Sequence, residues 1–107
     1  DVKSLDKATL RTMMTKCKGC NFGDADFRNM DLRGMTITGA NFGNTDFRGS
    51  DLRGTTFNGA NFSGAKFSGA NVDQTRFVGC NFAEADFRDV NLTRAEFVGS
   101  NMSGIIM

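Results

Sequence analysis

The sequence predicts an all-β solenoid: a square column of about four and a half coils with a short capping α-helix at its N-terminal end. Two periodicities support this fold class. All 11 Phe residues fall on one five-residue spacing, and Asn recurs at every fourth step of that spacing, directly before a large apolar residue. A chain of 107 residues has room for one domain of this kind, so a single core must account for the whole sequence.

The five-residue period defines the core. Five residues match neither the 3.6-residue turn of a helix nor the two-residue repeat of a strand, so each unit combines a short extended piece with a bend. Eighteen consecutive central positions, from residue 22 to residue 107, keep this period without an insertion. The predicted structural core is the set of large residues at the first sixteen of them: Phe22, Phe27, Leu32, Ile37, Phe42, Phe47, Leu52, Phe57, Phe62, Phe67, Val72, Phe77, Phe82, Phe87, Leu92 and Phe97.

The residue two places before each central position also points inward, because residues two apart share one face of extended backbone. It is usually Ala, Ser, Thr or Cys, which leaves room for the large neighbour. Four bulky residues depart from this rule: Met30, Met35, Val90 and Ile105. They lie in the first and last coils, so we expect them to pack against caps. The other three positions of each unit are mostly polar or Gly and face water.

The recurrence of Asn at every fourth unit indicates that four units make one coil. Asn21, Asn41, Asn61, Asn81 and Asn101 each precede a Phe or Met. We expect these asparagines to stack in one row and to bond to one another and to the turns, as in other solenoids. Because adjacent strands lie about 4.8 Å apart, four and a half coils make a column about 22 Å tall.

The pattern of a small residue, Asn or Asp, Phe or Leu, a polar residue and Gly, as in Asp51-Leu52-Arg53-Gly54, resembles the pentapeptide-repeat family. The resemblance covers residues 20–107. It implies a right-handed, four-sided (quadrilateral) β-helix with four pentapeptides per coil. Residues 1–19 lack the pattern and form the second part of the chain, an N-terminal helical cap.

The cap is predicted to be a short helix. From Ser4 to about Lys16, apolar residues alternate with good helix formers, with Ser4 as the expected N-cap and Gly19 able to end the helix. The alternative is an amphipathic helix that binds a membrane surface or a partner. We interpret the segment as a lid over the first coil, because terminal repeats need capping.

The C-terminal end has no comparable lid in the sequence. Met102, Ile105, Ile106 and Met107 give it an apolar surface. This surface predicts an end-to-end interface between two copies of the chain, a homodimer. The alternative is a chain cut from a longer one.

Three cysteines are present, of which Cys17 and Cys20 form a C-x-x-C motif. We favour two buried small residues at the junction of helix and solenoid, with a local disulfide as the alternative and a metal or redox site as the least favoured interpretation. Cys80 lies three coils from Cys20, about 14 Å by strand spacing, so these two cannot form a disulfide. Similar cysteine pairs occur near the first coil of some members of the family that the chain resembles.

Charge and composition exclude several classes of function. The chain has no His, which excludes His-based catalytic triads and His metal sites. Its 13 basic and 12 acidic residues nearly cancel, and stacked arginines follow an Asp two positions earlier, as Arg48 follows Asp46. We therefore predict a solvated, locally paired surface and no direct binding of nucleic acid. No catalytic residue, metal or cofactor is predicted, and no apolar run reaches the length of a membrane-spanning helix.

The function predicted from these features is a non-catalytic structural or protein-interaction module with an unnamed partner. The resemblance implies one alternative, because some pentapeptide-repeat proteins mimic duplex DNA, bind a type II topoisomerase such as DNA gyrase, and modulate it or protect it from quinolones. The near-neutral charge argues against this role. We expect a soluble chain, and the resemblance implies export to a periplasm or thylakoid lumen. A first residue of Asp1 rather than Met fits a leader or flanking sequence that has been removed.

Overall fold

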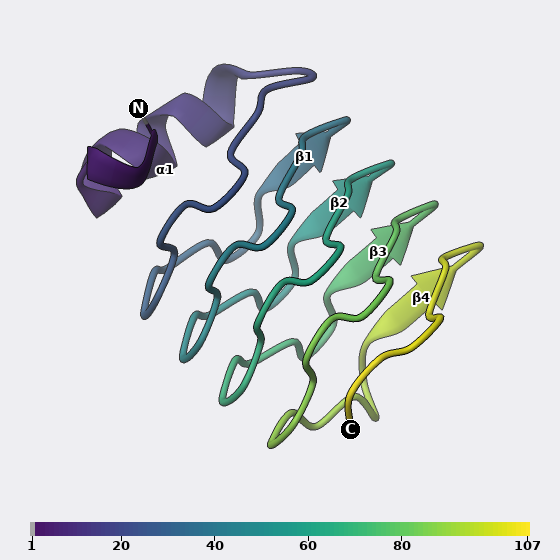
Figure 1. The fold of residues 1–107 in the computed structure, drawn as a ribbon. Coiled ribbons are helices and arrows are strands. Elements are labelled where there is room, and N and C mark those ends of the chain that lie inside the picture. Colours follow the sequence, from purple (N-terminus) through teal and green to yellow (C-terminus); the bar gives the residue numbers. More distant parts are fainter. Residues whose placement is uncertain (1) are drawn as a thin grey trace.

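The computed structural model describes residues 2–107, which wind into a column of parallel coils with a helix across the N-terminal end (Figure 1). The helical elements are η1, Val2–Ser4, and α1, Lys7–Lys16. Four three-residue strands follow: β1 (Thr36–Thr38), β2 (Thr56–Asn58), β3 (Arg76–Val78) and β4 (Glu96–Val98). They pair in parallel and in sequence order, each one coil beyond the last. The predicted all-β solenoid with four pentapeptides per coil is confirmed.

The column has four sides, each built from pentapeptides that recur once per coil. The first side starts at residue 20, the second at 25, the third at 30, and the fourth, which holds the strands, at 35. Isolated parallel bridges join the coils on the other sides, for example between Asn21 and Asn41. The backbone N–H of Phe22 donates to the carbonyl of Asn41 at 2.7 Å, and equivalent bonds recur along the column. Backbone hydrogen bonds therefore tie each coil to the next.

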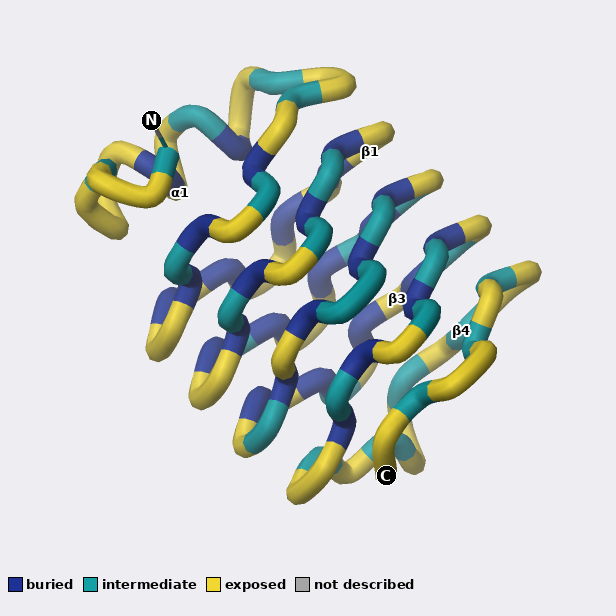
Figure 2. The backbone as a smooth tube through the Cα atoms, in the orientation of Figure 1, coloured by how far each residue is buried: buried dark blue, intermediate teal, exposed yellow. Residues whose placement is uncertain are grey.

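The large central residues are buried inside the column, and buried residues recur at regular intervals along each coil (Figure 2). Phe rings one coil apart stack nearly parallel, with centroids 4.8 to 5.5 Å apart. Rings on adjacent sides meet edge to face, as Phe57 and Phe62 do. The central residues from 22 to 87 are at most 1% exposed. Leu92 and Phe97 are only half-buried, because no further described coil covers them.

The helical cap begins later than predicted. Asp6 rather than Ser4 is the N-cap of α1, and its carboxylate accepts a 2.8 Å hydrogen bond from the Thr9 N–H. Ser4 belongs instead to the preceding η1 turn. The hydrogen bonds from Thr9 lower the pKa of Asp6, and a carboxylate at this position suits the positive end of the helix dipole. α1 buries Leu10 and Met14 in one apolar cluster with the first coil.

The bulky residues at inward positions find a cap at one end of the column only. Met30 and Met35 are buried in the same cluster as the apolar residues of α1, as expected. Val90 and Ile105 are only half-buried. No described residue forms the second cap that they predict.

The hydrogen-bond ladder opens at one corner of the third side. The N–H of Leu52 donates to the Asn71 carbonyl at 2.9 Å. Within residues 2–107, the equivalent bond from Val72 to Asn91 is missing, and Asn91 has no parallel bridge to Asn71. A hollow of about 340 Å³ lies between the two coils here. We attribute the opening to Val90, the bulky inward residue directly before Asn91.

Replacing Phe62 by Ala in the middle of the column should lower the free energy of unfolding by about 3 to 5 kcal/mol, through lost burial and the cavity left behind. Phe62 is fully buried and stacks on the rings of Phe42 and Phe82. Urea denaturation measures the change. A loss below about 1 kcal/mol would contradict the stacked core.

Replacing Val90 by Ala should leave the free energy of unfolding unchanged or raise it by up to about 1 kcal/mol, because regained backbone hydrogen bonds offset the lost methyl groups. Hydrogen exchange at the Val72 amide, followed by NMR, should slow. Ala70→Val is the matched control: it puts the same branched side chain one coil earlier and should destabilise the column. Unchanged exchange at Val72 in Val90→Ala would show that Val90 does not cause the opening.

Candidate functional site

The filled interior leaves the outside of the column as the place for function. Two hollows of about 340 Å³ each lie on the surface and are open to solvent, one beside the asparagine row of the first side and one at the open corner of the third. In the described part of the chain, no group of three or more His, Cys, Asp or Glu side chains is placed to hold a metal ion. No helix of residues 2–107 has the length and apolar character to cross a membrane.

The asparagine row on the first side is a structural ladder. Nδ2 of Asn41 donates to Oδ1 of Asn21 at 3.0 Å, and the same bond continues through Asn61 and Asn81 to Asn101. Each Oδ1 also accepts the backbone N–H two residues further along the chain. The expected bonding of the row to itself and to the turns is confirmed. These bonds occupy the amide oxygens that a ligand would need.

The charged residues on the second and third sides pair locally, as predicted. Nε and Nη2 of Arg28 each donate to the Asp26 carboxylate at 2.9 Å, and Asp26 also accepts the backbone N–H of Arg28. These hydrogen bonds lower the pKa of Asp26 to about 2. The same arrangement recurs in four more pairs: Asp31 with Arg33, Asp46 with Arg48, Asp51 with Arg53, and Asp86 with Arg88.

The pairs of the first two coils also interact between coils. Nε of Arg28 lies 3.9 Å from Oδ2 of Asp46, and Nε of Arg33 lies 3.7 Å from Oδ2 of Asp51. The carboxylates of the second coil are therefore each close to two guanidinium groups. Their negative charge relieves the repulsion between arginines stacked one coil apart.

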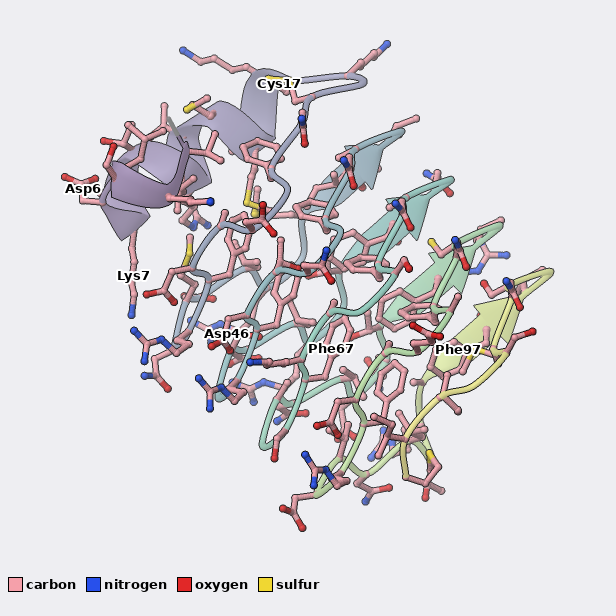
Figure 3. The ribbon with its side chains drawn as sticks, viewed as in Figure 1. Asp6, Lys7, Cys17, Asp46, Phe67 and Phe97 are labelled. Atoms are coloured by element: carbon pink, nitrogen blue, oxygen red, sulfur yellow. A yellow bond between two sulfur atoms is a disulfide. The ribbon has the colours of Figure 1, made fainter. Side chains whose placement is uncertain are left out.

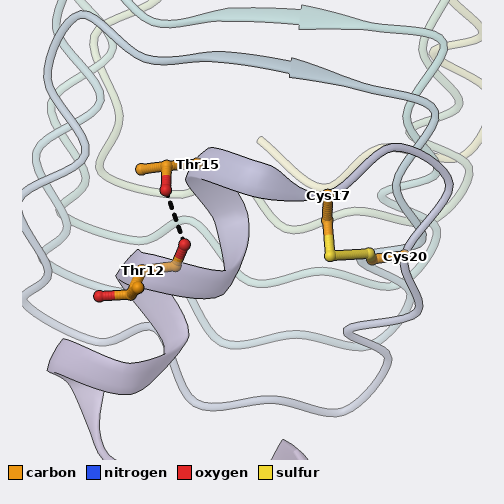
Figure 4. Close-up of a disulfide and its surroundings, with 4 residues drawn as sticks. All are labelled: Thr12, Thr15, Cys17 and Cys20. Carbon is orange, nitrogen blue, oxygen red and sulfur yellow. Dashed lines mark hydrogen bonds between the residues drawn. A yellow bond between two sulfur atoms is a disulfide. The ribbon is translucent and has the colours of Figure 1, made fainter.

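Cys17 and Cys20 form a disulfide, with their Cα atoms 5.7 Å apart (Figure 4). The favoured interpretation, two buried unbonded cysteines, is therefore wrong, since both residues are bonded and half-buried. The repeat explains the pairing: Cys17 lies five residues before Phe22, at the central position of an incomplete unit, and Cys20 occupies the next small inward position. In the following coil Ile37 and Ala40 fill the same corner.

The hydrogen-bond ladder accordingly begins before residue 20. Lys18 pairs in parallel with Thr38, and the N–H of Gly19 donates to the Thr38 carbonyl at 3.3 Å. Gly19 has a φ of 71°, close to the 70° of Gly39 at the same corner one coil later, a conformation that favours glycine. Residues 17–19, assigned to the cap from the sequence, thus follow the geometry of the column.

The last coil presents an apolar surface. Met102 and Ile105 are half-buried there, whereas Ile106 and Met107 are 45% and 70% exposed. Val98, at 45% exposed, adds to this surface and is not among the predicted residues. The equivalent outward residues are Thr38 in β1 and Asn58 in β2. The repeat pattern therefore predicts a residue that faces water at this position.

Comparison with models of known protein families identifies the family of this chain. A model of a pentapeptide repeat region matches residues 40–107, and a model of eight pentapeptide repeats matches residues 15–54. The chain belongs to the pentapeptide-repeat family. The second match starts at residue 15, in agreement with a ladder that begins at Lys18. None of the curated protein sequences matches the chain.

Solved structures of other pentapeptide-repeat proteins share this fold. The protein from the Arabidopsis thaliana thylakoid lumen has a TM-score of 0.76 at 22% identity, over 82% of this chain and 61% of that one. QnrB1, a plasmid-mediated fluoroquinolone resistance protein, has a TM-score of 0.75 at 24% identity, over 79% and 44%. HetL, involved in heterocyst differentiation regulation in the cyanobacterium Nostoc sp. strain PCC 7120, has a TM-score of 0.61 at 22% identity, over 84% and 46%.

The fold common to these proteins is the right-handed quadrilateral β-helix that the resemblance implies. This pentapeptide-repeat chain spans between 44% and 61% of the length of the three structures. At sequence identities of 22% to 24%, the likeness to these structures shows a shared fold.

Reducing the disulfide should lower the free energy of unfolding of this pentapeptide-repeat protein by about 2 kcal/mol, the amount attributed to closing a four-residue loop in the unfolded chain. α1 should stay folded, because Leu10 and Met14 still anchor it. Urea denaturation with and without a thiol reductant measures the difference. The Cys17→Ala/Cys20→Ala variant is the control, and a response of that variant to reductant would contradict the assignment to this disulfide.

Replacing Arg48 by Ala should change the free energy of unfolding by no more than about 0.5 kcal/mol, because an ion pair with this much exposure contributes little. The Arg48 side chain is 48% exposed although it bonds to Asp46. Thermal and urea denaturation measure the effect. A loss above about 1 kcal/mol would show that the ladder of ion pairs stabilises the column.

Proposed function

We propose that this pentapeptide-repeat protein is a non-catalytic scaffold that binds protein partners through the outer sides of its column. The filled interior carries the proposal, because central residues at most 1% exposed leave only the surface available to a partner. Hydrogen bonds between coils hold that surface in one shape. A preorganised surface loses little conformational entropy on binding.

Site-specific photocrosslinking tests this role one side at a time. A photoreactive amino acid is placed at the outward position of each side in the same coil: Ser63, Ser68, Asp73 or Val78. Crosslinking in the cells that make the protein, followed by mass spectrometry, should trap the same partner from one side or two adjacent sides. Crosslinks from no side would contradict the scaffold role.

A second candidate function is binding to a type II topoisomerase with an effect on quinolone action, and the fold shared with QnrB1 favours it. Charge argues against it, because 13 basic and 12 acidic residues do not resemble duplex DNA, which carries one negative charge per about 1.7 Å. A DNA gyrase supercoiling assay tests this candidate, with the protein titrated in the presence and absence of a quinolone. Dose-dependent inhibition or protection at micromolar protein would favour this candidate, and no effect would reject it.

We also propose that the exposed end of the last coil stacks on the same end of a second copy. Val98, Ile106 and Met107 are exposed there, and the Met102 N–H has no partner among the described residues. Another coil offers apolar side chains and backbone groups in the matching pattern, whereas α1 covers the first coil. The column measures 23 by 23 Å across, so its end face can bury roughly 500 Å² on each copy. This area is near the lower limit of specific interfaces, and a weak dimer is therefore expected.

Sedimentation equilibrium over a range of concentrations tests the stacked dimer. Met107→Lys should weaken association about tenfold or more, because Met107 is an inward-pointing central residue left 70% exposed at this end, and the substitution places an unpaired charge in the contact. Val78→Lys is the matched control, at an outward position of β3 away from the end. A monomer at every concentration, or equal effects of the two substitutions, would contradict the dimer.

A further inference from the structure

Arginines line the second and third sides of the column next to their shared edge, each of them paired with an Asp. The first two coils place arginines one above the other on each side, because Asp26 bridges in parallel to Asp46 and Asp31 bridges to Asp51. α1 adds two more basic residues above the first coil. We call the resulting set the cationic corner, and its members are Lys7, Arg11, Arg28, Arg33, Arg48 and Arg53.

Contacts with the first coil place the two cap residues in this set. Nε of Arg11 donates to the Asp31 carbonyl at 2.9 Å. Together with the hydrogen bonds from Arg28, the positive charge of Lys7 helps to lower the pKa of Asp26. Lys7 extends from α1 toward the side of the column on which Asp46 lies (Figure 3). Each column of arginines is therefore continued by a cation from the cap.

The guanidinium groups are the outermost charges of the second coil. Arg48 and Arg53 are each 48% exposed, whereas the carboxylates of Asp46 and Asp51 are 21% and 29% exposed. The hydrogen bonds within each pair use Nε and Nη2. Nη1 makes no hydrogen bond to any described residue and can bind an anion from outside. The Asp partners hold the arginines in fixed positions, which limits the entropy lost on binding.

We propose that the cationic corner binds an acidic α-helix of a protein partner, lying along the column axis with its carboxylates against both rows of cations. The inference rests on the proposed scaffold function and names the chemistry of the partner. Spacing favours a helix, whose successive turns are about 5.4 Å apart against about 4.8 Å between coils. Side chains on one face of a strand are about 6.8 Å apart, a mismatch of about 2 Å at each step.

The same geometry disfavours other anionic partners. Duplex nucleic acid carries its charges more densely than one per coil, about one per 3.4 Å along each strand. The four carboxylates of Asp26, Asp31, Asp46 and Asp51 would also repel a uniform polyanion. An acidic helix is narrow enough to lie along the edge and contact both rows.

Fluorescence anisotropy tests the proposal with a labelled helical peptide that carries Glu at i, i+4 and i+7 on one face. The full chain is the binding protein. Arg48→Gln/Arg53→Gln should weaken binding about tenfold, and added salt should weaken binding to the unaltered chain. Arg88→Gln is the matched control, because Arg88 pairs with Asp86 in the same way but lies two coils from Arg48; its affinity should stay within about twofold. Circular dichroism checks that each variant is folded.

Three outcomes would overturn the proposal: no saturable binding at low salt, equal losses in Arg88→Gln and Arg48→Gln/Arg53→Gln, or tighter binding of duplex DNA or anionic vesicles than of the peptide. A scrambled peptide with its Glu residues spread around the helix should bind more weakly than the patterned one, and equal binding would also overturn it. These failures differ from failure of the scaffold role, which photocrosslinking reports independently. Crosslinks without peptide binding would leave a scaffold with a partner of other chemistry.

Discussion

The structure depends on the coincidence of two distances. Aromatic rings stack with centroids about 5 Å apart, and hydrogen-bonded strands lie about 4.8 Å apart. A coil of four pentapeptides satisfies both at once, because it returns each Phe above another Phe while the N–H of a central residue such as Phe42 or Phe62 meets a carbonyl of the next coil. A coil of another length would misplace the rings and the hydrogen bonds together. This requirement explains a chain whose central positions follow one period without an insertion.

The inward positions could be predicted from the sequence because size and spacing alone determine them. The ring stack and the asparagine ladder follow from residues that repeat at every fourth pentapeptide. The N-cap does not follow in the same way, since Ser4 and Asp6 are both good capping residues and only the η1 turn decides between them. The disulfide could be predicted only by extending the five-residue period backward from Phe22 to Cys17.

The candidate surface could be predicted only in part. Pairing of each Arg with the Asp two residues earlier follows from the repeat, as in Arg28 and Asp26. The greater exposure of the guanidinium groups depends on side-chain geometry that periodicity does not contain. The contribution of Arg11 depends on how α1 lies across the first coil, and no sequence pattern encodes that orientation. Val98 joins the apolar end only because β4 is the last strand of the sheet.

The open corner beside Asn91 bears on how such a column can change in length. Elsewhere an inserted residue would break the bonds of the coils above and below it. At this corner the described residues already lack the bond from Val72 to Asn91, and the Gln74 N–H bonds to the Arg94 carbonyl, one residue further along than the step from Gly54 to Asp73. The strands beyond this corner keep the 20-residue register, with Arg76 opposite Glu96, and Phe67 stays stacked on Phe87. This is the position where the chain can accept a loop, and so acquire a new surface feature, at the least cost to its core.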